Sequence, residues 1–448
     1  MKRMKLFKSL IVTMLIVLLL PTNIVANAQE STGQIQNIIA NSAIVMDMDT
    51  GEVIASKNAE KQRPVASTIK LLTSLIFAEN TSKDEMIPFT ADALKTTQTA
   101  LNNFKNIKVG DKISSNDLMK AVLIFSANDA AYVMADSVAG NTKDFVKMMN
   151  EKVKSLGLKN TYIVNPCGLE RDALNPDSNE VNLSTAYDIA VIAKEAYKNE
   201  WIRDIISEKY KNTSIDLDGT PIIIDTRNKI LGQDGNVGGK TGNESQAGHC
   251  FVGFFKRDGR NLVTVALNSQ YGVDGTNVFN DTKQIANTGY NAKEQAYKKS
   301  GEEIASIDLE YKAFGFFGPK KTIKAPIIAT KDIMYYKNDI NDKNAKIEYD
   351  NSGKSAWKLA NDDVELTFSL PDYKETVTGK VDISVFDLIK SNMMLYLGIL
   401  IGFILIVAII LLILKLIYTR RSRNRRSAYN RRNMYRRSRK NSRYKYKR

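Results

Sequence analysis

Histidine and cysteine are scarce in this chain of 448 residues, which contains one histidine, His249, and two cysteines, Cys167 and Cys250. A single histidine leaves only one candidate for the base of a Ser-His-Asp triad. Two cysteines exclude a disulfide-rich scaffold and a cysteine-based zinc site. They could form one bridge, or they could be two small buried apolar residues. We therefore expect neither a metal site nor a cofactor.

Acidic residues are absent from 419–448, a segment that holds fifteen of the 64 Lys and Arg residues. The other 49 basic residues balance the 49 Asp and Glu residues, so the net charge of +15 belongs to this tail. A neutral main body gives no support to a nucleic-acid partner. The tail has too little apolar content to fold alone, and we expect it to be attracted to anionic lipid. An RNA or protein partner of the tail stays open.

The first uncharged apolar run, Leu10–Leu20, follows a basic segment and is too short to span a membrane comfortably. Pro21 ends this run, and the sequence Ala-Asn-Ala at 26–28 fits the small-x-small pattern of a signal-peptide cleavage site. Residues 1–28 are therefore predicted to be a signal peptide, with a mature chain that begins near Gln29.

The second uncharged apolar run, Leu395–Leu414, has the length that crosses the hydrocarbon core of a bilayer. Lys415 and the arginine-rich tail follow it directly, and basic flanks stay on the cytoplasmic side. We expect a single transmembrane helix at 393–418, a cytoplasmic tail at 419–448, and the preceding globular part on the outer, wall-facing side.

Hydrophobic periodicity predicts the elements of the globular part. Helices are expected at 69–77, 116–125, 130–138, 145–156, 184–197 and 278–290. Strands are expected as one hairpin over 42–57 and another over 251–267, the second with an Asp-Gly turn. Further short strands are expected at 333–336, 347–349, 364–370 and 377–385.

Helices that stand between an early and a late group of antiparallel strands indicate an α+β fold. We assign residues 36–295 to this α+β domain. The short strands that follow predict a small all-β domain at 305–388. This second domain shows no catalytic constellation, and we interpret it as a spacer between the first domain and the membrane.

Three short motifs occur in one order along the chain: Ser-Thr-Ile-Lys at 67–70, Ser-Ala-Asn at 126–128 and Lys-Thr-Gly at 240–242. Each motif alone is weak, because patterns this short arise by chance in a long chain. A helix cap, a solvated lysine, a turn or a strand end would explain any single one. All three in order, in an exported protein, favour a serine acyl-transfer site.

Ser67 and Lys70 supply a nucleophile and its base. Their spacing places both side chains on one helix face, one turn apart. Lysine can take the serine proton only if its pKa is lowered by burial or by a nearby cation, and Lys240 is the candidate cation. Backbone N–H groups at the helix start and near Asn243 would stabilise the oxyanion.

The other motif residues fit roles in proton transfer and substrate binding. Ser126 could relay a proton between Lys70 and the leaving amine, and Asn128 could hold that lysine and bind the substrate amide. Lys240 and Thr241 suit a terminal carboxylate, as a charge and a hydroxyl. Gly242 allows a close backbone approach.

The residues around these motifs resemble the low-molecular-weight penicillin-binding proteins, the serine D-alanyl-D-alanine carboxypeptidases. The matching segments are 46–53, 63–73, 126–131, 165–169, 239–242 and 247–250. The resemblance covers roughly 42–290 and implies a penicillin-recognising fold in which peptidoglycan stem peptide acylates Ser67, releases its terminal D-alanine and is then hydrolysed. It also implies that β-lactams trap Ser67, that Lys70 accepts the proton and that Lys240 binds substrate.

The chain departs from this family at several positions. Members often carry His where Cys167 stands and Tyr or Phe where His249 stands. Many also carry an Arg soon after the strand that ends at Leu267, whereas Asn-Ser-Gln follows here at 268–270. A spanning anchor in place of an amphipathic one is the last difference.

Two other functions stay open. A β-lactamase would need a second base for deacylation, and Glu170 only faintly fits the spacing of such a residue. A non-catalytic sensor would use the same pocket to bind penicillin or wall peptide. The intact serine and lysine residues of the motifs favour a carboxypeptidase over both alternatives.

Overall fold

The computed structural model describes residues 33–444, apart from 208, 210 and 351–352. The signal peptide predicted at 1–28 lies outside the described residues. Contacts divide the chain into two compact units that alternate along the sequence. The first extends to Tyr297 and includes Asp332–Lys346 and Thr367–Glu375, whereas the second takes Lys298–Lys331, Ile347–Leu366 and the chain from Thr376 onward.

An antiparallel sheet of five strands forms the centre of the first unit, in the order β2-β1-β11-β10-β9. Its strands are β1 (Ser42–Asp47), β2 (Val53–Lys57), β9 (Asn236–Glu244), β10 (Gly248–Arg257) and β11 (Arg260–Ser269). Both predicted hairpins are confirmed, because β1 pairs with β2 and β10 pairs with β11. Strand β9 is an edge of the sheet as far as the described residues go.

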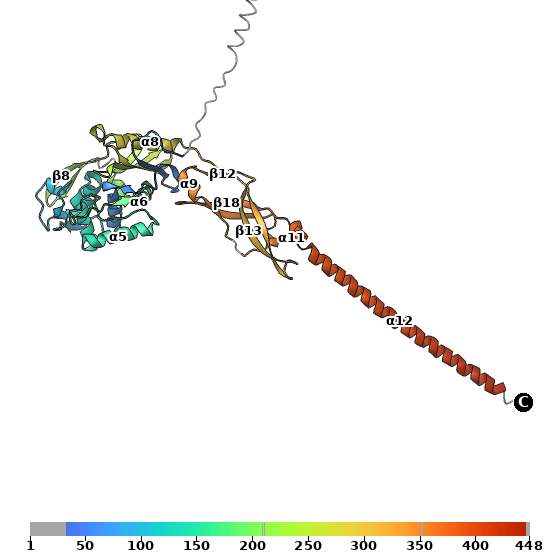
Figure 1. Ribbon diagram of the computed structural model, residues 1–448. Coiled ribbons are helices and arrows are strands. Elements are labelled where there is room, and N and C mark those ends of the chain that lie inside the picture. The colour runs from blue at the N-terminus through green and yellow to red at the C-terminus, as the bar shows by residue number, and fades with distance from the viewer. Residues whose placement is uncertain (1–32, 208, 210, 351–352, 445–448) are drawn as a thin grey trace, which may run out of the picture. The chain divides into compact units, whose positions relative to one another are not determined.

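Alternation along β1 sends its side chains to both faces of the sheet. Ile44 and Met46 join the core around α2 (Lys70–Asn80) and α6 (Ala186–Lys198). Ala43 and Val45 join a second core that includes α8 (Asn277–Asn291). Helices therefore cover both faces of the sheet, and Figure 1 shows α6 and α8 on either side of it.

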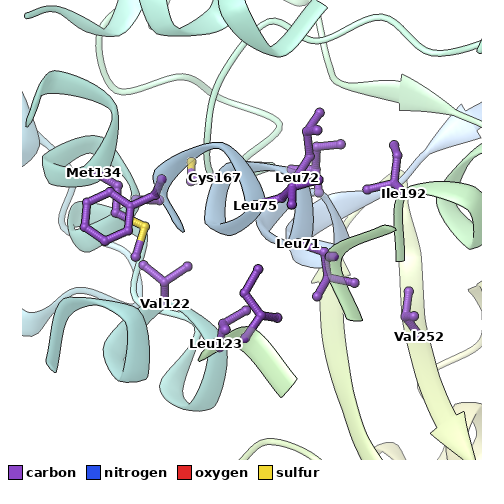
Figure 2. Close-up of a cluster of buried hydrophobic side chains, with 14 of the residues drawn as sticks. Leu71, Leu72, Leu75, Val122, Leu123, Met134, Cys167, Ile192 and Val252 are labelled. Atoms are coloured by element: carbon purple, nitrogen blue, oxygen red, sulfur yellow. The ribbon is translucent and has the colours of Figure 1, made fainter. Parts of the chain in front are cut away.

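A helical region packs around α2, which is buried on several sides. Figure 2 shows the leucines of α2 between Val122 and Met134 on one side and Ile192 and Val252 on the other. The other helical elements of this unit are η1 (Ala66–Ile69), η2 (Ala93–Lys95), η3 (Leu101–Asn103), α3 (Ser115–Lys120), the π-turn η4 (Ala121–Phe125), α4 (Asn128–Ala139), α5 (Thr142–Ser155), α7 (Glu200–Ile205), η6 (Val273–Gly275) and α9 (Asp339–Asn344).

Side-chain caps fix where three of these helices begin. The side chains of Ser114, Asn141 and Thr185 each accept a hydrogen bond from the backbone N–H three residues later. Such caps satisfy a donor that the first helical turn leaves free. The helix expected over 116–125 is confirmed: α3 continues directly into the wider π-helix η4, which ends before Ser126.

Two smaller sheets lie beside this helical region. One pairs β3 (Arg63–Pro64) with β6 (Leu183–Ser184). The other has the order β4-β5-β7-β8, formed by β4 (Met86–Pro88), β5 (Lys112–Ser114), β7 (Asn212–Leu217) and β8 (Thr220–Asp225). These short strands had no counterpart among the predicted elements.

A second five-stranded sheet, in the order β13-β14-β18-β17-β16, contains most of the short strands expected after the α+β domain. Its strands are β13 (Glu303–Lys312), β14 (Lys320–Ala329), β16 (Lys346–Glu348), β17 (Asp363–Leu370) and β18 (Tyr373–Val381). The strand expected at 333–336 forms β15 (Ile333–Tyr335), which pairs with β12 (Gln295–Lys298) and not with this sheet.

Three helices complete the second unit: α10 (Ala356–Leu359), α11 (Val385–Ser391) and α12 (Met393–Tyr444). Helix α12 is the long red helix of Figure 1. Its apolar part is long enough to cross a membrane, and none of it is buried in the protein. Within the described part of the chain, α12 is the single helix that is long and apolar enough to cross a membrane.

Candidate active site

Ser67 and Lys70 form the centre of the site. Ser67 lies in the 3₁₀ turn η1, and Lys70 begins α2, so the predicted spacing of one turn is confirmed. The Lys70 Nζ atom lies 2.7 Å from Ser67 Oγ, 2.6 Å from Asn128 Oδ1 and 2.6 Å from the Cys167 carbonyl oxygen. Three acceptors match the three hydrogens of a lysine ammonium. Loss of one proton would leave the amine held by two bonds, with its lone pair facing Ser67.

The loop at 165–168 shapes the turn that carries Ser67. Asn165 accepts hydrogen bonds from the N–H groups of Cys167 and Gly168, which folds the loop so that the Cys167 carbonyl faces Lys70. A Cβ atom on Gly168 would lie 2.1 Å from the Ala66 carbonyl oxygen. Ala66 itself has a left-handed φ of +46° directly before Ser67. The loop and η1 therefore fit together only with glycine at 168.

The Ser-Ala-Asn motif forms the opposite wall. Ser126 follows the π-turn with a left-handed φ of +72°, and α4 begins at Asn128. The Asn128 side chain bonds Lys70 through Oδ1 and donates through Nδ2 to the Gln98 carbonyl oxygen. Its backbone N–H donates to the Thr99 carbonyl oxygen. The segment 98–99, which no motif identified, is thus fixed to the wall.

Strand β9 forms the third side. A Cβ on Gly242 would lie 2.9 Å from the Ser67 nitrogen and 3.0 Å from Ala66 Cβ, so glycine here makes room for the turn that carries Ser67. Lys240 donates to Ser126 Oγ at 2.8 Å and to the Thr241 carbonyl oxygen at 2.7 Å. In this structure Ser126 is thus paired with Lys240, the lysine of the third motif.

Both lysines are almost completely buried, with exposed fractions of 0% for Lys70 and 1% for Lys240. Burial lowers the pKa of Lys70 to about 8, against the weaker opposing influence of nearby acidic groups. Burial lowers the pKa of Lys240 well below its usual value, and the positive charges of Lys70 and Arg227 lower it further. A lysine in this pocket can lose its proton near neutral pH, as a base must.

A cavity of about 320 Å³ opens above these groups. Six predicted site residues line it: Ser67, Ser126, Asn128, Thr241, Gly242 and Asn243. Lys70 and Lys240 lie behind this lining, within reach of the Ser67 and Ser126 hydroxyls. The cations that line the cavity are Arg227 and Lys229, both exposed. No sequence signal identified them, because they belong to no motif.

His249 also lines the cavity. Its ring stacks on Tyr271 at 5.1 Å and meets Phe279 edge-on at 5.7 Å. Burial, and then the charge of Lys229, lower its pKa to about 4, so the imidazole is neutral at physiological pH. Its Nδ1 atom is buried without a hydrogen-bond partner among the described residues. These contacts give His249 a packing role in the cavity wall.

Two carboxylates stand at the end of β9. Burial, and then the charge of Glu170, raise the pKa of Glu244 to about 7. Glu244 lines the cavity, whereas one oxygen of Glu170 accepts hydrogen bonds from the backbone N–H groups of Gln246 and Ala247. Glu170 therefore ties the turn between β9 and β10.

The two cysteines are free and buried, so the single possible disulfide is not formed. The contact that Cys167 makes with Lys70 uses its carbonyl oxygen, which any residue would supply. Among the described residues, no three His, Cys, Asp or Glu side chains come together in a way that could hold a metal ion.

Comparison with known proteins gives consistent matches to the first unit. The sequence model of the D-alanyl-D-alanine carboxypeptidase family, peptidase S11, matches residues 27–271. The chain is 30% identical over 231 residues to the D-alanyl-D-alanine carboxypeptidase DacF of Bacillus subtilis, which covers 51% of this chain and 57% of that protein. It is 30% identical over 274 residues to the D-alanyl-D-alanine carboxypeptidase DacC of Escherichia coli, and the match covers 59% of this chain and 64% of that protein. The chain thus spans less than two thirds of each of these curated relatives.

Solved structures give the same result. A D-alanyl-D-alanine carboxypeptidase from Mycobacterium tuberculosis superposes with a TM-score of 0.52 at 26% identity, covering 58% of this chain and 94% of that one. The cefotaxime-bound form of penicillin-binding protein D2 from Listeria monocytogenes superposes with a TM-score of 0.50 at 27% identity. This match covers 57% of this chain and 99% of that one. The predicted penicillin-recognising fold is confirmed.

Proposed function

Because the chain belongs to the D-alanyl-D-alanine carboxypeptidase family, we propose that it is a serine carboxypeptidase that removes the terminal D-alanine from peptidoglycan stem peptides. One observation carries this proposal: Ser67 Oγ lies 2.7 Å from the Nζ of a buried lysine and faces a cavity built by all three motifs. That arrangement is an activated serine nucleophile. β-Lactams would acylate the same oxygen.

The first half of the reaction follows from the contacts of Lys70. Its neutral amine takes the proton of Ser67, and the Oγ atom attacks the carbonyl carbon of the penultimate residue. The N–H groups of Ser67 and Asn243 would hold the oxyanion, each contributing about 3 to 4 kcal/mol of transition-state stabilisation. Collapse of this intermediate breaks the peptide bond and leaves an ester on Ser67.

The leaving amine needs the proton that Lys70 has taken. Ser126 can hand its own hydroxyl proton to the amine and receive a replacement from Lys70, whose bond to Ser67 Oγ weakens once that oxygen is acylated. Ser126 bonds Lys240 in this structure, so the transfer requires Lys70 to come within its reach. Water then attacks the ester, gives its proton to Lys70, and Ser67 regains a proton from that lysine.

The substrate would bind along the outer edge of β9, whose backbone groups can pair with an extended peptide. Its terminal carboxylate would lie by Thr241, where Arg227 and Lys229 supply positive charge to the cavity. This modifies the expected role of Lys240, which is buried and bonded to Ser126. Asn128 remains the proposed partner of the substrate amide.

The chain would be anchored by α12, with the first unit on the wall side of the membrane and the basic tail in the cytoplasm. The long apolar helix followed by basic residues supports this orientation. We also retain the proposed division into a signal peptide at 1–28, a peptidase domain at 36–295, a β spacer at 305–388, a transmembrane helix at 393–418 and a tail at 419–448.

The alternatives are not favoured. A β-lactamase would need a free base for deacylation, and Glu170 is tied to the backbone of the turn after β9. A sensor acylated by penicillin would use the same Ser67–Lys70 pair, so release of D-alanine is the observation that separates it from a carboxypeptidase.

Release of D-alanine tests the proposal. The purified full chain in detergent is incubated with N-acylated Lys-D-Ala-D-Ala, beside a Ser67→Ala variant. We expect free D-alanine from the unmodified chain and none from the variant. Penicillin acylation without D-alanine release would instead support the sensor.

A further inference from the structure

The turn between β13 and β14 carries three phenylalanines that the proposed function does not use. The sequence at 314–317 is Phe-Gly-Phe-Phe. Phe316 is 83% exposed and Phe317 is 52% exposed, although both are large apolar side chains. Phe314 stacks on Phe317 at 4.9 Å, and Phe316 lies 4.9 Å from Phe317. The rings thus form one cluster at the tip of the hairpin.

This aromatic tip is attached to the beginning of the apolar helix. The Phe314 ring lies 5.3 Å from the ring of Tyr396 in α12, and the Tyr396 hydroxyl donates to the Ala313 carbonyl oxygen. Tyr396 is the second residue of the uncharged run Leu395–Leu414. The tip therefore stands at the level where the helix passes from water into apolar surroundings, and aromatic rings are enriched at that level of membrane proteins.

A second set of contacts joins β13 to the residues directly before α12. The Asn392 side chain donates to the Tyr311 hydroxyl at 3.0 Å, and that hydroxyl also lies 2.8 Å from Ser391 Oγ. These bonds join the end of β13 to the junction of α11 and α12. The aromatic tip is thus held beside the helix through Tyr311, Ala313 and Phe314, on the side where β13 leads into the turn.

The backbone of the tip is suited to a poorly hydrated environment. The N–H groups of Ala313, Phe314, Gly315 and Phe316 all donate to carbonyl oxygens within the turn. The Lys312 ammonium donates to the Phe316 carbonyl oxygen at 3.1 Å. Because unsatisfied backbone groups are costly in hydrocarbon, a turn of this kind suits the membrane interface and not the bilayer core. Here four N–H groups of the turn are bonded internally while the rings of Phe316 and Phe317 are exposed.

Further apolar side chains are exposed on α11 and at the start of α12. Phe386 and Ile389 of α11 are 65% and 41% exposed, and Met394 at the start of α12 is 84% exposed. Lys320 and Lys321 follow the tip on β14, where their ammonium groups could reach lipid headgroups while their stems stay apolar. Single exposed apolar residues are common, but several of them around the start of one apolar helix favour an interaction surface.

We propose that the aromatic tip, Phe314–Phe317, inserts into the membrane interface beside α12 and gives the second unit a second contact with lipid. This inference rests on the proposed membrane-spanning role of α12. The occupant is lipid and not a protein partner, because the tip continues the lipid-facing surface of the helix at the residue where the apolar run begins.

Spin labels on single introduced cysteines test the proposal in the full chain, reconstituted in vesicles of zwitterionic and anionic phospholipid. The three sites are Phe316→Cys at the tip, Leu405→Cys in the middle of the apolar run, and Lys331→Cys beyond the far end of β14 as the exposed control. Cys167 and Cys250 are fully buried and should stay unlabelled. Depth is measured as accessibility to oxygen, which enriches in lipid, against a water-soluble nickel complex.

We expect the label at 405 to be deep, the label at 316 to be shallow but in lipid, and the label at 331 to be in water. A label at 316 that behaves like the one at 331, while 405 remains deep, would overturn the insertion of the tip and leave the spanning helix intact. A label at 405 in water would overturn both the insertion of the tip and the membrane-spanning role of α12. Phe317→Cys provides a second site, for which the same shallow depth is expected.

Discussion

At the scale of single residues, the proposed reactivity of Ser67 depends on the protonation of Lys70. Its ammonium donates three hydrogen bonds in a fully buried position, and burial brings its pKa to about 8. The protonated form cannot accept the Ser67 proton, so only the neutral fraction of the enzyme is reactive.

The rate of penicillin acylation is therefore expected to rise with pH, with a midpoint near 8. Below that pH the lysine is charged and the rate falls about tenfold per pH unit, because each unit removes that share of the neutral amine. Rapid-mixing measurements of the second-order acylation constant between pH 6 and 10 check this. A rate that stays flat across the range would contradict Lys70 as the base.

Asn128→Asp should move this midpoint upward. The carboxylate would stand where Oδ1 now lies 2.6 Å from Lys70 Nζ, and an adjacent negative charge favours the charged lysine. Acylation at pH 7 should then fall by at least tenfold and recover in part at high pH. A loss that is the same at every pH would point to disturbed folding and not to the pKa of Lys70.

At the scale of elements, the fit between the 165–168 loop and η1 sets the position of Ser67. Gly168 combines a left-handed φ of +88° with contact to the Ala66 carbonyl. Gly157, at the end of α5, has a similar φ of +75°, but an added Cβ there meets no described atom within 4 Å. Alanine substitutions at these two glycines therefore distinguish the cost of a left-handed backbone from the cost of a steric clash.

Gly157→Ala should cost about 1 kcal/mol of stability and leave acylation unchanged, because left-handed backbone is its only penalty. Gly168→Ala should lower stability further and reduce acylation by at least a hundredfold, because the new Cβ displaces the turn that carries Ser67. Thermal unfolding and penicillin acylation measure the two effects. Equal behaviour of the two variants would contradict the proposed role of the loop.

The sequence predicted the parts of the site that depend on side-chain type and local spacing. A serine and a lysine three residues apart at a helix start meet through helical geometry alone, and the structure has them 2.7 Å apart. The Cys167 carbonyl could not be predicted, because a backbone acceptor leaves no trace in residue type. Arg227 and Lys229 were missed because only the tertiary fold brings them to the cavity.

For the fold, too, local sequence patterns were predictive and contacts between distant segments were not. Strong local patterns predicted both hairpins of the central sheet and most helices. The partners of short strands depend on contacts distant in sequence, so the strand at 333–336 was expected in the β domain but pairs with β12. The helix before Ser126 was predicted, but its change from α to π geometry over Ala121–Phe125 was not, since its apolar residues continue the pattern of α3.

At the scale of the whole molecule, we propose that the basic tail and the first unit lie on opposite sides of a membrane. The first unit would face the wall that holds its substrate, and the tail would contact anionic lipid on the other side.

A cysteine at Ser422 in the tail should be protected from a membrane-impermeant maleimide in intact cells and react after permeabilisation. A cysteine at Lys331 should react in both conditions, which serves as the control. Cys167 and Cys250 are buried and should not contribute. Labelling of the tail in intact cells would reverse the proposed orientation.

The central claim is that Ser67 is the nucleophile, and mapping the site of a penicillin adduct tests it most directly. The full chain is incubated with benzylpenicillin, digested and analysed by mass spectrometry, beside Ser67→Ala and Ser126→Ala. The account predicts an adduct on Ser67 in the unmodified chain, a slower adduct on the same residue in Ser126→Ala, and none in Ser67→Ala. An adduct on another residue, or one that persists in Ser67→Ala, would contradict it.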